Sequence, residues 1–180
     1  MCEVKTGVIR EEKEEKKNIH KTNNSPRFVG LDPSFNGMGI IVLDSHGEII
    51  EQILHKAKEG EVEERLLDIE NRIKFIPMIP RLETVYIEGP SYSSSGAFVL
   101  QMGALHFLIR LIFLKKKINY KVIAPGTLKK FVAGTGVAKK ELMLLKTYKK
   151  WGIEFNDNNL CDAYGLARMA LGDFKDENNR

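Results

Sequence analysis

Three short apolar runs follow one another closely near the start of the chain, and turn-forming residues separate them. The runs are Phe28–Asp32, Met38–Leu43 and Glu48–Leu54, and the turns between them read "PSFNG" and "DSHG". Short apolar runs bounded by Gly, Asn, Asp and Ser are typical of β-strands joined by tight turns. The three segments are therefore predicted to form an antiparallel meander.

Strand and helix patterns alternate along the rest of the chain. A helix is predicted over 61–76, a strand over "ETVYIEGP", a long helix over 95–114 and a strand over "YKVIAP". Three further helices are predicted near 127–132, 139–151 and 159–172. A meander followed by strand–helix alternation indicates an α/β fold with a five-stranded mixed sheet and helices on both faces.

Length and composition favour one soluble domain with a charged arm. Residues 1–26 are polar and aperiodic, 27–174 carry the strand and helix patterns, and 175–180 read as a polar tail. The N-terminus lacks the apolar stretch of a secretion signal, and Gln101, His106 and Arg110 interrupt the longest apolar run. We therefore expect a cytoplasmic protein without a membrane span. The two cysteines predict neither a disulfide nor a zinc site.

Three acidic residues occupy positions in the predicted core elements where apolar residues are expected. Asp32 ends the first strand, and Glu88 ends the fourth on the face opposite Val85 and Ile87. Asp162 lies within "LCDAYGLA", whose apolar residues form one face of a helix. Taken singly, each acid has an ordinary explanation, as a turn former, an edge residue and a helix-surface charge. Together they predict a shared site.

A shared cluster of buried carboxylates needs a positive partner. Burial of an unpaired carboxylate is costly, and the usual remedies are a basic side chain or a metal ion. No Lys or Arg adjoins any of the three acids in sequence, which favours a divalent cation. Oxygen ligands without a Cys or His cluster point to Mg²⁺, with Mn²⁺ as a substitute.

The motifs around these acids resemble those of a known family. "GLDPSFNGMGI", "YIEGPSY" and "CDAYGLA", in this order, resemble the RuvC-type Holliday junction resolvases of the ribonuclease H-like superfamily, phage-encoded members most of all. The resemblance covers about residues 27–172. It implies metal-assisted phosphodiester hydrolysis on four-way DNA junctions. Symmetric cutting of two strands implies a two-fold homodimer, and the apolar helix 97–113 is either its contact surface or a fully internal helix.

The resemblance also implies a ligand set for two metal ions. Asp32 would bridge them, and Glu88 and Asp162 would hold one each. The family adds a fourth ligand, commonly acidic, one turn before the last aspartate. That position is Asn159 here, with Asn158 also one turn away and Asp157 as the nearest acid. Asp157 is either a ligand or an ordinary helix N-cap, and the sequence leaves this open.

Positive charge is concentrated in one segment. Residues 110–150 hold twelve Lys or Arg and one acid, in a chain whose net charge is +4. The segment indicates a polyanion partner, although a lysine-rich solvated face would look the same. By resemblance, Lys129 and Lys140 contact the scissile phosphate, Lys130 and Lys139 add non-specific affinity, and Tyr92 stacks at the junction.

Two other functions fit the same residues. A ribonuclease H-like nuclease acting on flaps, forks or structured RNA would use the same metal site. Because Asn159 replaces the usual acid at the position of the fourth ligand, the chain could also be a catalytically weak binder of branched DNA. A phosphotransferase of the actin or hexokinase kind, which the first motif also resembles, needs two such domains and more residues than this chain has.

Overall fold

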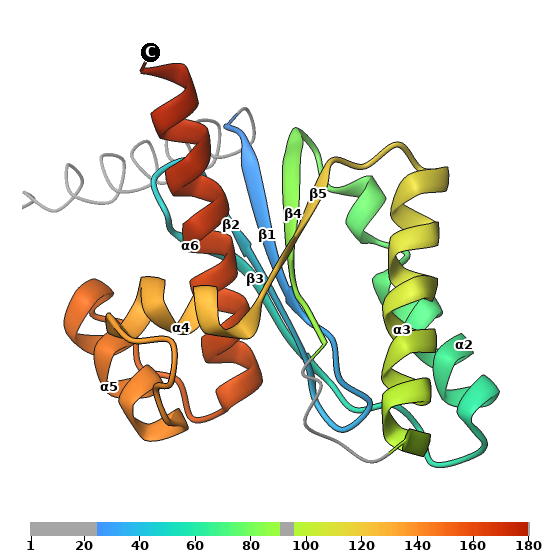
Figure 1. Ribbon diagram of the computed structural model, residues 1–180. Coiled ribbons are helices and arrows are strands. Elements are labelled where there is room, and N and C mark those ends of the chain that lie inside the picture. Colours follow the sequence, from blue (N-terminus) through green and yellow to red (C-terminus); the bar gives the residue numbers. More distant parts are fainter. Residues whose placement is uncertain (1–24, 91–95, 180) are drawn as a thin grey trace, which may run out of the picture.

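The computed structural model describes residues 25–90 and 96–179, which form a five-stranded mixed sheet between two layers of helices (Figure 1). The strand order is β3-β2-β1-β4-β5. β1 pairs antiparallel with β2 and β2 with β3, whereas β1 pairs parallel with β4 and β4 with β5. The strands are β1 (Arg27–Asp32), β2 (Met38–Leu43), β3 (Ile49–His55), β4 (Leu82–Glu88) and β5 (Tyr120–Ile123). The predicted meander and mixed sheet are confirmed.

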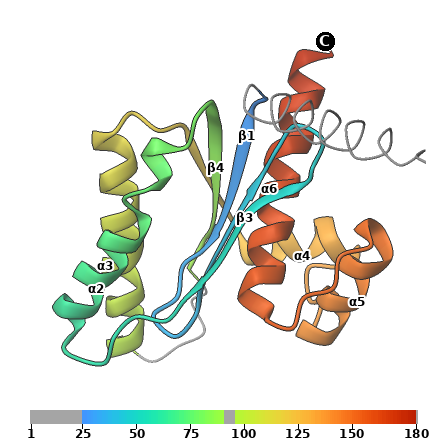
Figure 2. The ribbon, with the colours of Figure 1, turned by 180° about the vertical axis from the view of Figure 1, so that it is seen from behind.

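The helices divide between the two faces of the sheet. α2 and α3 cover one face, and α4, α5 and α6 cover the other, as both ribbon views show (Figures 1 and 2). A short 3₁₀ turn, η1, connects α2 to β4. The bounds are α2 (Val62–Ile73), η1 (Ile76–Met78), α3 (Gly96–Lys115), α4 (Pro125–Ala133), α5 (Lys140–Trp151) and α6 (Asn158–Asn178).

The central strands are buried on both faces, so they separate two hydrophobic cores. Along β1, Phe28 packs in the core under α6, whereas Val29 and Leu31 pack in the core under α2 and α3. This alternation follows from the two-residue period of a strand. The even-numbered positions of β1, including Asp32, therefore face α6.

Two glycines bring α6 close to the sheet. A Cβ on Gly30 would overlap the carbonyl oxygen of Ala163, and a Cβ on Gly39 would overlap that of Asn159. Gly30 lies on β1 and Gly39 on β2, so the N-terminal half of α6 rests directly on strand backbone. This close approach sets the height of the helix above the ends of the strands.

α6 is longer than predicted. It continues to Asn178, through most of the segment expected to be a polar tail. Side chains of its last turns hold it to the sheet: the ring of Phe174 lies 5.1 Å from that of Phe28, and Asp173 accepts hydrogen bonds from Tyr86 (2.5 Å) and Lys121 (3.0 Å). Residues 1–24 of the expected arm lie outside the described residues.

α3 is less buried than a core helix. Leu105, Ile109 and Phe113 are fully buried against the sheet, but only 22% of its most apolar window is buried. By length and composition, it is the one helix in the described ranges that could span a membrane. Its inner side packs in the core on one face of the sheet, so we interpret it as a surface helix with an apolar outer side.

Candidate active site

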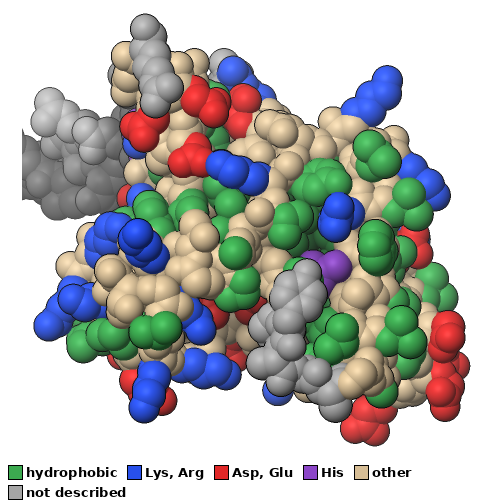
Figure 3. Space-filling model, in the orientation of Figure 1, with side chains coloured by type: hydrophobic (Ala, Val, Ile, Leu, Met, Phe, Trp, Pro, Cys, Tyr) green, Lys and Arg blue, Asp and Glu red, His purple; other side chains and the backbone are tan. Residues whose placement is uncertain are grey.

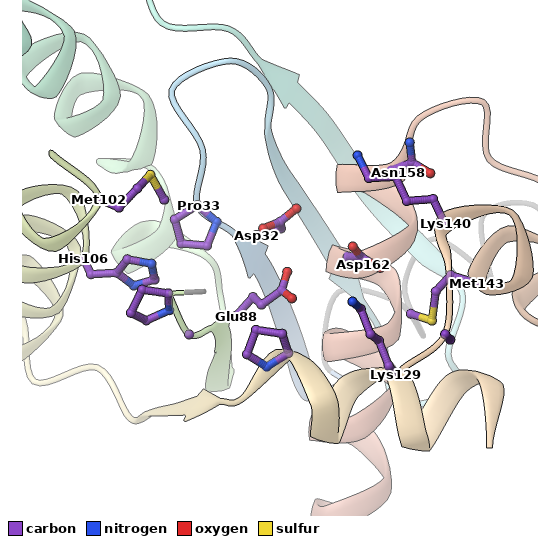
Figure 4. Close-up of a pocket in the computed structure, with 14 residues that line it drawn as sticks. Asp32, Pro33, Glu88, Met102, His106, Lys129, Lys140, Met143, Asn158 and Asp162 are labelled. Carbon is purple, nitrogen blue, oxygen red and sulfur yellow. The ribbon is translucent and has the colours of Figure 1, made fainter. Parts of the chain in front are cut away.

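Three carboxylates meet where β1 and β4 end beside α6. Asp32 is the last residue of β1, Glu88 is the last of β4, and Asp162 lies just after the first turn of α6. One oxygen from each lies within 4.8 Å of those of the other two. Figure 4 shows the three side chains converging on one space. The predicted clustering of these acids is therefore present in the structure.

The strand register explains why the first two acids lie side by side. β1 and β4 are parallel neighbours in which Leu31 is paired with Ile87, so the next residue of each strand carries a carboxylate at the same edge of the sheet. Both side chains face α6 because they follow the same alternation. The helix then presents Asp162 to them from above.

Burial and mutual repulsion hold these carboxylates partly protonated in the absence of a cation. Burial raises the pKa of Asp32 well above its usual range, and the charges of Glu88 and Asp162 raise it further. Burial also raises the pKa of Asp162 to about 7, where the nearby Glu88 adds to the effect and two lysines oppose it. The pKa of Glu88 is raised by burial, although Asp32 and Lys129 lower it in part.

The donor set fits a hard divalent cation. Three carboxylates within 4.8 Å supply only oxygen atoms, which Mg²⁺ and Mn²⁺ prefer. A cation at the cluster would favour the ionised forms and remove the repulsion between the acids. The three carboxylates could therefore hold such a cation.

The carboxylates line a cavity of about 220 Å³ that basic residues close from the α4–α5 side. Lys129 comes from α4 and Lys140 from the start of α5. Figure 4 shows Lys129 reaching toward Asp162 and Glu88, and its positive charge lowers the pKa of Glu88. The two lysines singled out in the sequence thus lie in the same site as the acids.

The residues near the expected fourth ligand are placed differently from one another. The carboxylate of Asp157 caps α6, accepting from the backbone N–H of Asn159 (2.8 Å) and of Leu160 (3.2 Å). The side-chain amide of Asn159 lies against Gly37, where an added Cβ would be 2.6 Å from Nδ2. Asn158 lines the cavity instead. Of these three residues, Asn158, four residues before Asp162, is therefore the one that lines the cavity.

Sequence reasoning missed one polar residue of this cavity. His106, from the long apolar helix α3, lines it together with Met102 and Pro90. The sequence reads as an apolar helix at this point, and a single His in such a helix carries no signal of its own. Only the packing of α3 across the end of β4 places it beside the carboxylates.

Several basic residues gather over α4 and α5. Figure 3 shows Lys and Arg side chains over α4 and α5, to one side of the central hollow. Lys130, Lys139 and Lys140 are exposed there, and Lys129 is half-buried. Tyr92 lies outside the described residues. The described lysines thus form a positive rim on one wall of the cavity.

RuvC proteins are similar to this chain in sequence. No family model matches the chain. The crossover junction endodeoxyribonuclease RuvC of a Sulfurovum species is 25% identical over 145 residues, covering 78% of this chain and 91% of that protein. RuvC of Petrotoga mobilis is 26% identical over 117 residues, covering 63% and 72%. The chain resembles RuvC over most of its length.

Solved structures agree with the RuvC-type fold. Thermus thermophilus RuvC superposes with a TM-score of 0.68 and 19% identity, covering 85% of this chain and 96% of that one. The same RuvC in complex with a Holliday junction substrate gives a TM-score of 0.70. The yeast mitochondrial Holliday junction resolvase Ydc2 gives 0.53 with 10% identity. The predicted ribonuclease H-like class is confirmed, and a closer relation to phage members stays a prediction.

Proposed function

We propose that this RuvC-type protein is a metal-dependent endonuclease that resolves four-way DNA junctions. One observation carries the proposal: Asp32, Glu88 and Asp162 converge within 4.8 Å on the RuvC-type fold, beside two lysines. Relatives of the same type are crossover junction endodeoxyribonucleases, and they match over most of their length. The proposal places this activity in the cytoplasm, in a domain spanning residues 27–174.

The residues of the site divide the work of phosphodiester hydrolysis. Divalent cations, Mg²⁺ or Mn²⁺ and two by the family pattern, would supply an activated water and charge stabilisation at the phosphate. Asp32, Glu88 and Asp162 would together hold these cations, and the family resemblance assigns Asp32 to both of them. Asn158 lines the cavity and would offer its side-chain oxygen to a cation as a neutral ligand.

Lys129 and Lys140 are assigned to the DNA phosphate. Both line the cavity, and the ammonium group of each can donate hydrogen bonds to a phosphate oxygen. Lys130 and Lys139 lie on the adjoining surface and add sequence-independent affinity. Stacking by Tyr92 stays a prediction.

A homodimer would present two such sites to one junction. The outer side of α3 exposes Leu100, Phe107, Leu111 and Leu114, which we call the α3 outer face. These residues recur at helical spacing on one side of α3, and a contiguous apolar patch of this kind marks an association surface. The predicted contact through this helix is therefore part of the proposal.

Cleavage of synthetic junctions tests the function. We expect Mg²⁺-dependent, paired cuts in a four-way junction and little cutting of a linear duplex of the same sequence. Asp32→Asn should cleave at least about a thousandfold more slowly, because a metal ligand is lost. It should bind the junction at least as tightly as wild type, because one carboxylate no longer repels the phosphate. Asp176→Asn, the same change at an exposed position of α6, is the matched control.

Other outcomes would replace the proposal. Faster cutting of flaps, forks or structured RNA than of four-way junctions would assign a different substrate to the same site. Tight junction binding without cutting at any Mg²⁺ or Mn²⁺ concentration would make the protein a branched-DNA binder. Normal cleavage by Asp32→Asn would remove the carboxylate cluster from the mechanism.

A further inference from the structure

A second cavity adjoins the turn that joins β1 to β2. Pro33, directly after Asp32, lines the carboxylate cavity, whereas Phe35 and Asn36 of the same turn line the second one. The second cavity has a volume of about 400 Å³, and we call it the Arg65 cavity. Its charged lining residues come from the β3–α2 connection and from α2, and they are Lys56, Lys58, Glu59 and Arg65. The two cavities therefore flank one short turn.

Arg65 has no counter-ion in the part of the chain that the structure describes. Its guanidinium forms no ion pair with a described carboxylate. Its Nε is buried without a hydrogen-bond partner, and its Nη2 donates to the neutral side chain of Asn36 (3.3 Å). Its Cζ lies 4.6 Å from the centroid of the Phe35 ring, which supports it from one side. A partly buried charge without a partner is unfavourable, so this arrangement favours an anionic ligand.

Backbone hydrogen bonds join the segments that form the Arg65 cavity. The N–H of Ala57 donates to the carbonyl oxygen of Phe35 (3.1 Å), which ties the β3–α2 connection to the β1–β2 turn. The N–H of Lys58 donates to the carboxylate of Asp68 on α2 (3.2 Å). The backbone beside Arg65 is therefore already held in place, so binding of a ligand orders little more than side chains.

The charges and donors of the Arg65 cavity match a phosphate group. Two lysines and one arginine stand against a single acid, Glu59, among its described lining residues. A guanidinium donates in a planar fork that fits phosphate oxygens, and lysines add charge without strict geometry. The carboxylate of Glu64, one residue before Arg65, accepts from the backbone N–H of Glu61 (3.2 Å) and makes no ion pair with the guanidinium.

We propose that the Arg65 cavity binds a second phosphate of the DNA strand whose scissile phosphate lies at the carboxylates. The inference rests on the proposed function for its substrate. Arg65 donates to oxygens of this second phosphate, and Lys56 and Lys58 add charge. α2 lies on the face of the sheet opposite α4 and α5 (Figure 1), so the strand is held on both sides of the metal centre. Two fixed phosphates set the register of the strand over the carboxylates.

A binding cycle with neutralised phosphates tests the inference without requiring cleavage. Four-way junctions in EDTA carry a single methylphosphonate, which replaces one charged phosphate oxygen with a methyl group, and it is moved one position at a time through the crossover. At one position other than the scissile one, the wild type should bind about tenfold more weakly, the lower end of the range for a hydrogen bond to a charged group. The same change should hardly affect Arg65→Met, because its partner is already missing.

Further variants separate the phosphate contact from folding and from general charge. Arg72→Met makes the same change at an exposed position of α2 and should keep the wild-type methylphosphonate profile. Arg65→Lys keeps the charge without the planar fork and should show a smaller effect at the same position. If Arg65→Met melts below the assay temperature, Arg65→Gln replaces it. Identical profiles for the wild type and the uncharged Arg65 variant would overturn the inference.

A free phosphate ion is the other source of the same chemistry. Inorganic phosphate, titrated by calorimetry into the wild type and Arg65→Met without DNA, distinguishes the two sources. Phosphate binding by the wild type alone, together with identical methylphosphonate profiles, would give the cavity to free phosphate and overturn its assignment to DNA. A protein that binds junctions and never cuts them would defeat the proposed function, while the methylphosphonate cycle would still decide the role of the Arg65 cavity.

Discussion

In the metal-free protein, the buried carboxyl group of Asp32 lowers the free energy of unfolding when it is ionised, and the same group belongs to the proposed metal site. Its side chain is 9% exposed, and burial raises its pKa well above the usual range. The folded, metal-free protein therefore keeps protons that the unfolded chain releases near pH 4. As pH rises from about 4 toward 7, where Asp162 titrates, the free energy of unfolding falls, because the unfolded state loses its protons first.

The first prediction is that Asp32→Asn stabilises the metal-free protein. In EDTA at pH 7.5 its melting temperature should exceed that of wild type, because the amide ends the repulsion among three carboxylates. The difference should shrink at pH 5, where the wild-type cluster is already protonated. Thermal melting across this pH range measures it, with Asp176→Asn as control. A variant that melts at or below the wild-type temperature at pH 7.5 would contradict the cluster's electrostatics.

The second prediction concerns the fourth ligand. Asn158 lines the cavity, so Asn158→Asp should add a carboxylate to the site and lower the Mg²⁺ concentration for half-maximal cleavage several-fold. Asn159→Asp is the matched control, because that side chain lies against Gly37 instead. Magnesium titrations of the two variants decide between the positions. A larger effect at Asn159 would mean that the helix presents the other residue to the metal.

The third prediction is that Asp157 acts as a cap. Asp157→Ala removes the acceptor for two backbone N–H groups at the start of α6 and should lower the free energy of unfolding by roughly 0.5–2 kcal/mol. Urea denaturation measures the loss, and Asp157→Ser, which keeps a capping oxygen, should recover most of it. The Mg²⁺ requirement for cleavage should stay at the wild-type value. A raised requirement would instead make Asp157 a ligand.

The acids could be predicted from sequence at the residue scale, and the neutral residues could not. Asp32 and Glu88 each interrupt an apolar strand pattern, which is a visible conflict between local preference and burial. Asn158 and Asn159 are separated by about 100° of rotation around the axis of α6. The apolar pattern of α6 does not fix the rotation of the helix closely enough to tell which of the two faces the cavity. His106 depends on where α3 crosses the sheet, and that is decided by contacts distant in sequence.

At the scale of elements, α6 determines the site. It packs on β1, β2 and β4 and carries Asp162. The strands and helices follow from alternation, periodicity and turn residues, so their order could be predicted. The end of α6 could not, because the contacts of Asp173 and Phe174 with the sheet outweigh the polar character of its last two turns.

The fourth prediction is that Gly30→Ala disrupts the protein. A methyl group at Gly30 would overlap the carbonyl oxygen of Ala163, and backbone cannot move aside as a flexible side chain can. We expect a loss of several kcal/mol in the free energy of unfolding or insoluble protein. Gly172→Ala, a helical site with open space, should gain up to about 1 kcal/mol. Denaturation curves compare the two, and a soluble Gly30→Ala of wild-type stability would contradict the close packing of α6.

At the scale of the whole molecule, the surface is divided between charge and apolar area. Lysines rim the cavity over α4 and α5, whereas the α3 outer face lies across the sheet from them (Figures 1 and 3). Composition predicted the charge segregation, but not which side of α3 remains uncovered. One face for DNA and another for a second copy would let a dimer place two active sites on one junction.

The fifth prediction tests that arrangement. Leu111→Glu places a charge on the α3 outer face and should convert the proposed dimer to a monomer in sedimentation experiments. The fold should be kept because Leu111 is 48% exposed. Paired cutting of a junction should then separate into independent nicks. Leu67→Glu, on the exposed side of α2, is the control. An unchanged sedimentation coefficient for Leu111→Glu would place the interface elsewhere.

The contact between Gly30 and Ala163 links the hydrophobic core to the choice of ion. Gly30 is two residues before Asp32, and Ala163 directly follows Asp162, so one backbone contact sets how far apart two of the acids lie. Mg²⁺ requires oxygen ligands at about 2.0–2.1 Å, whereas Ca²⁺ accepts about 2.3–2.6 Å. A core substitution that shifts α6 by a few tenths of an ångström would therefore change ion selectivity without altering any ligand.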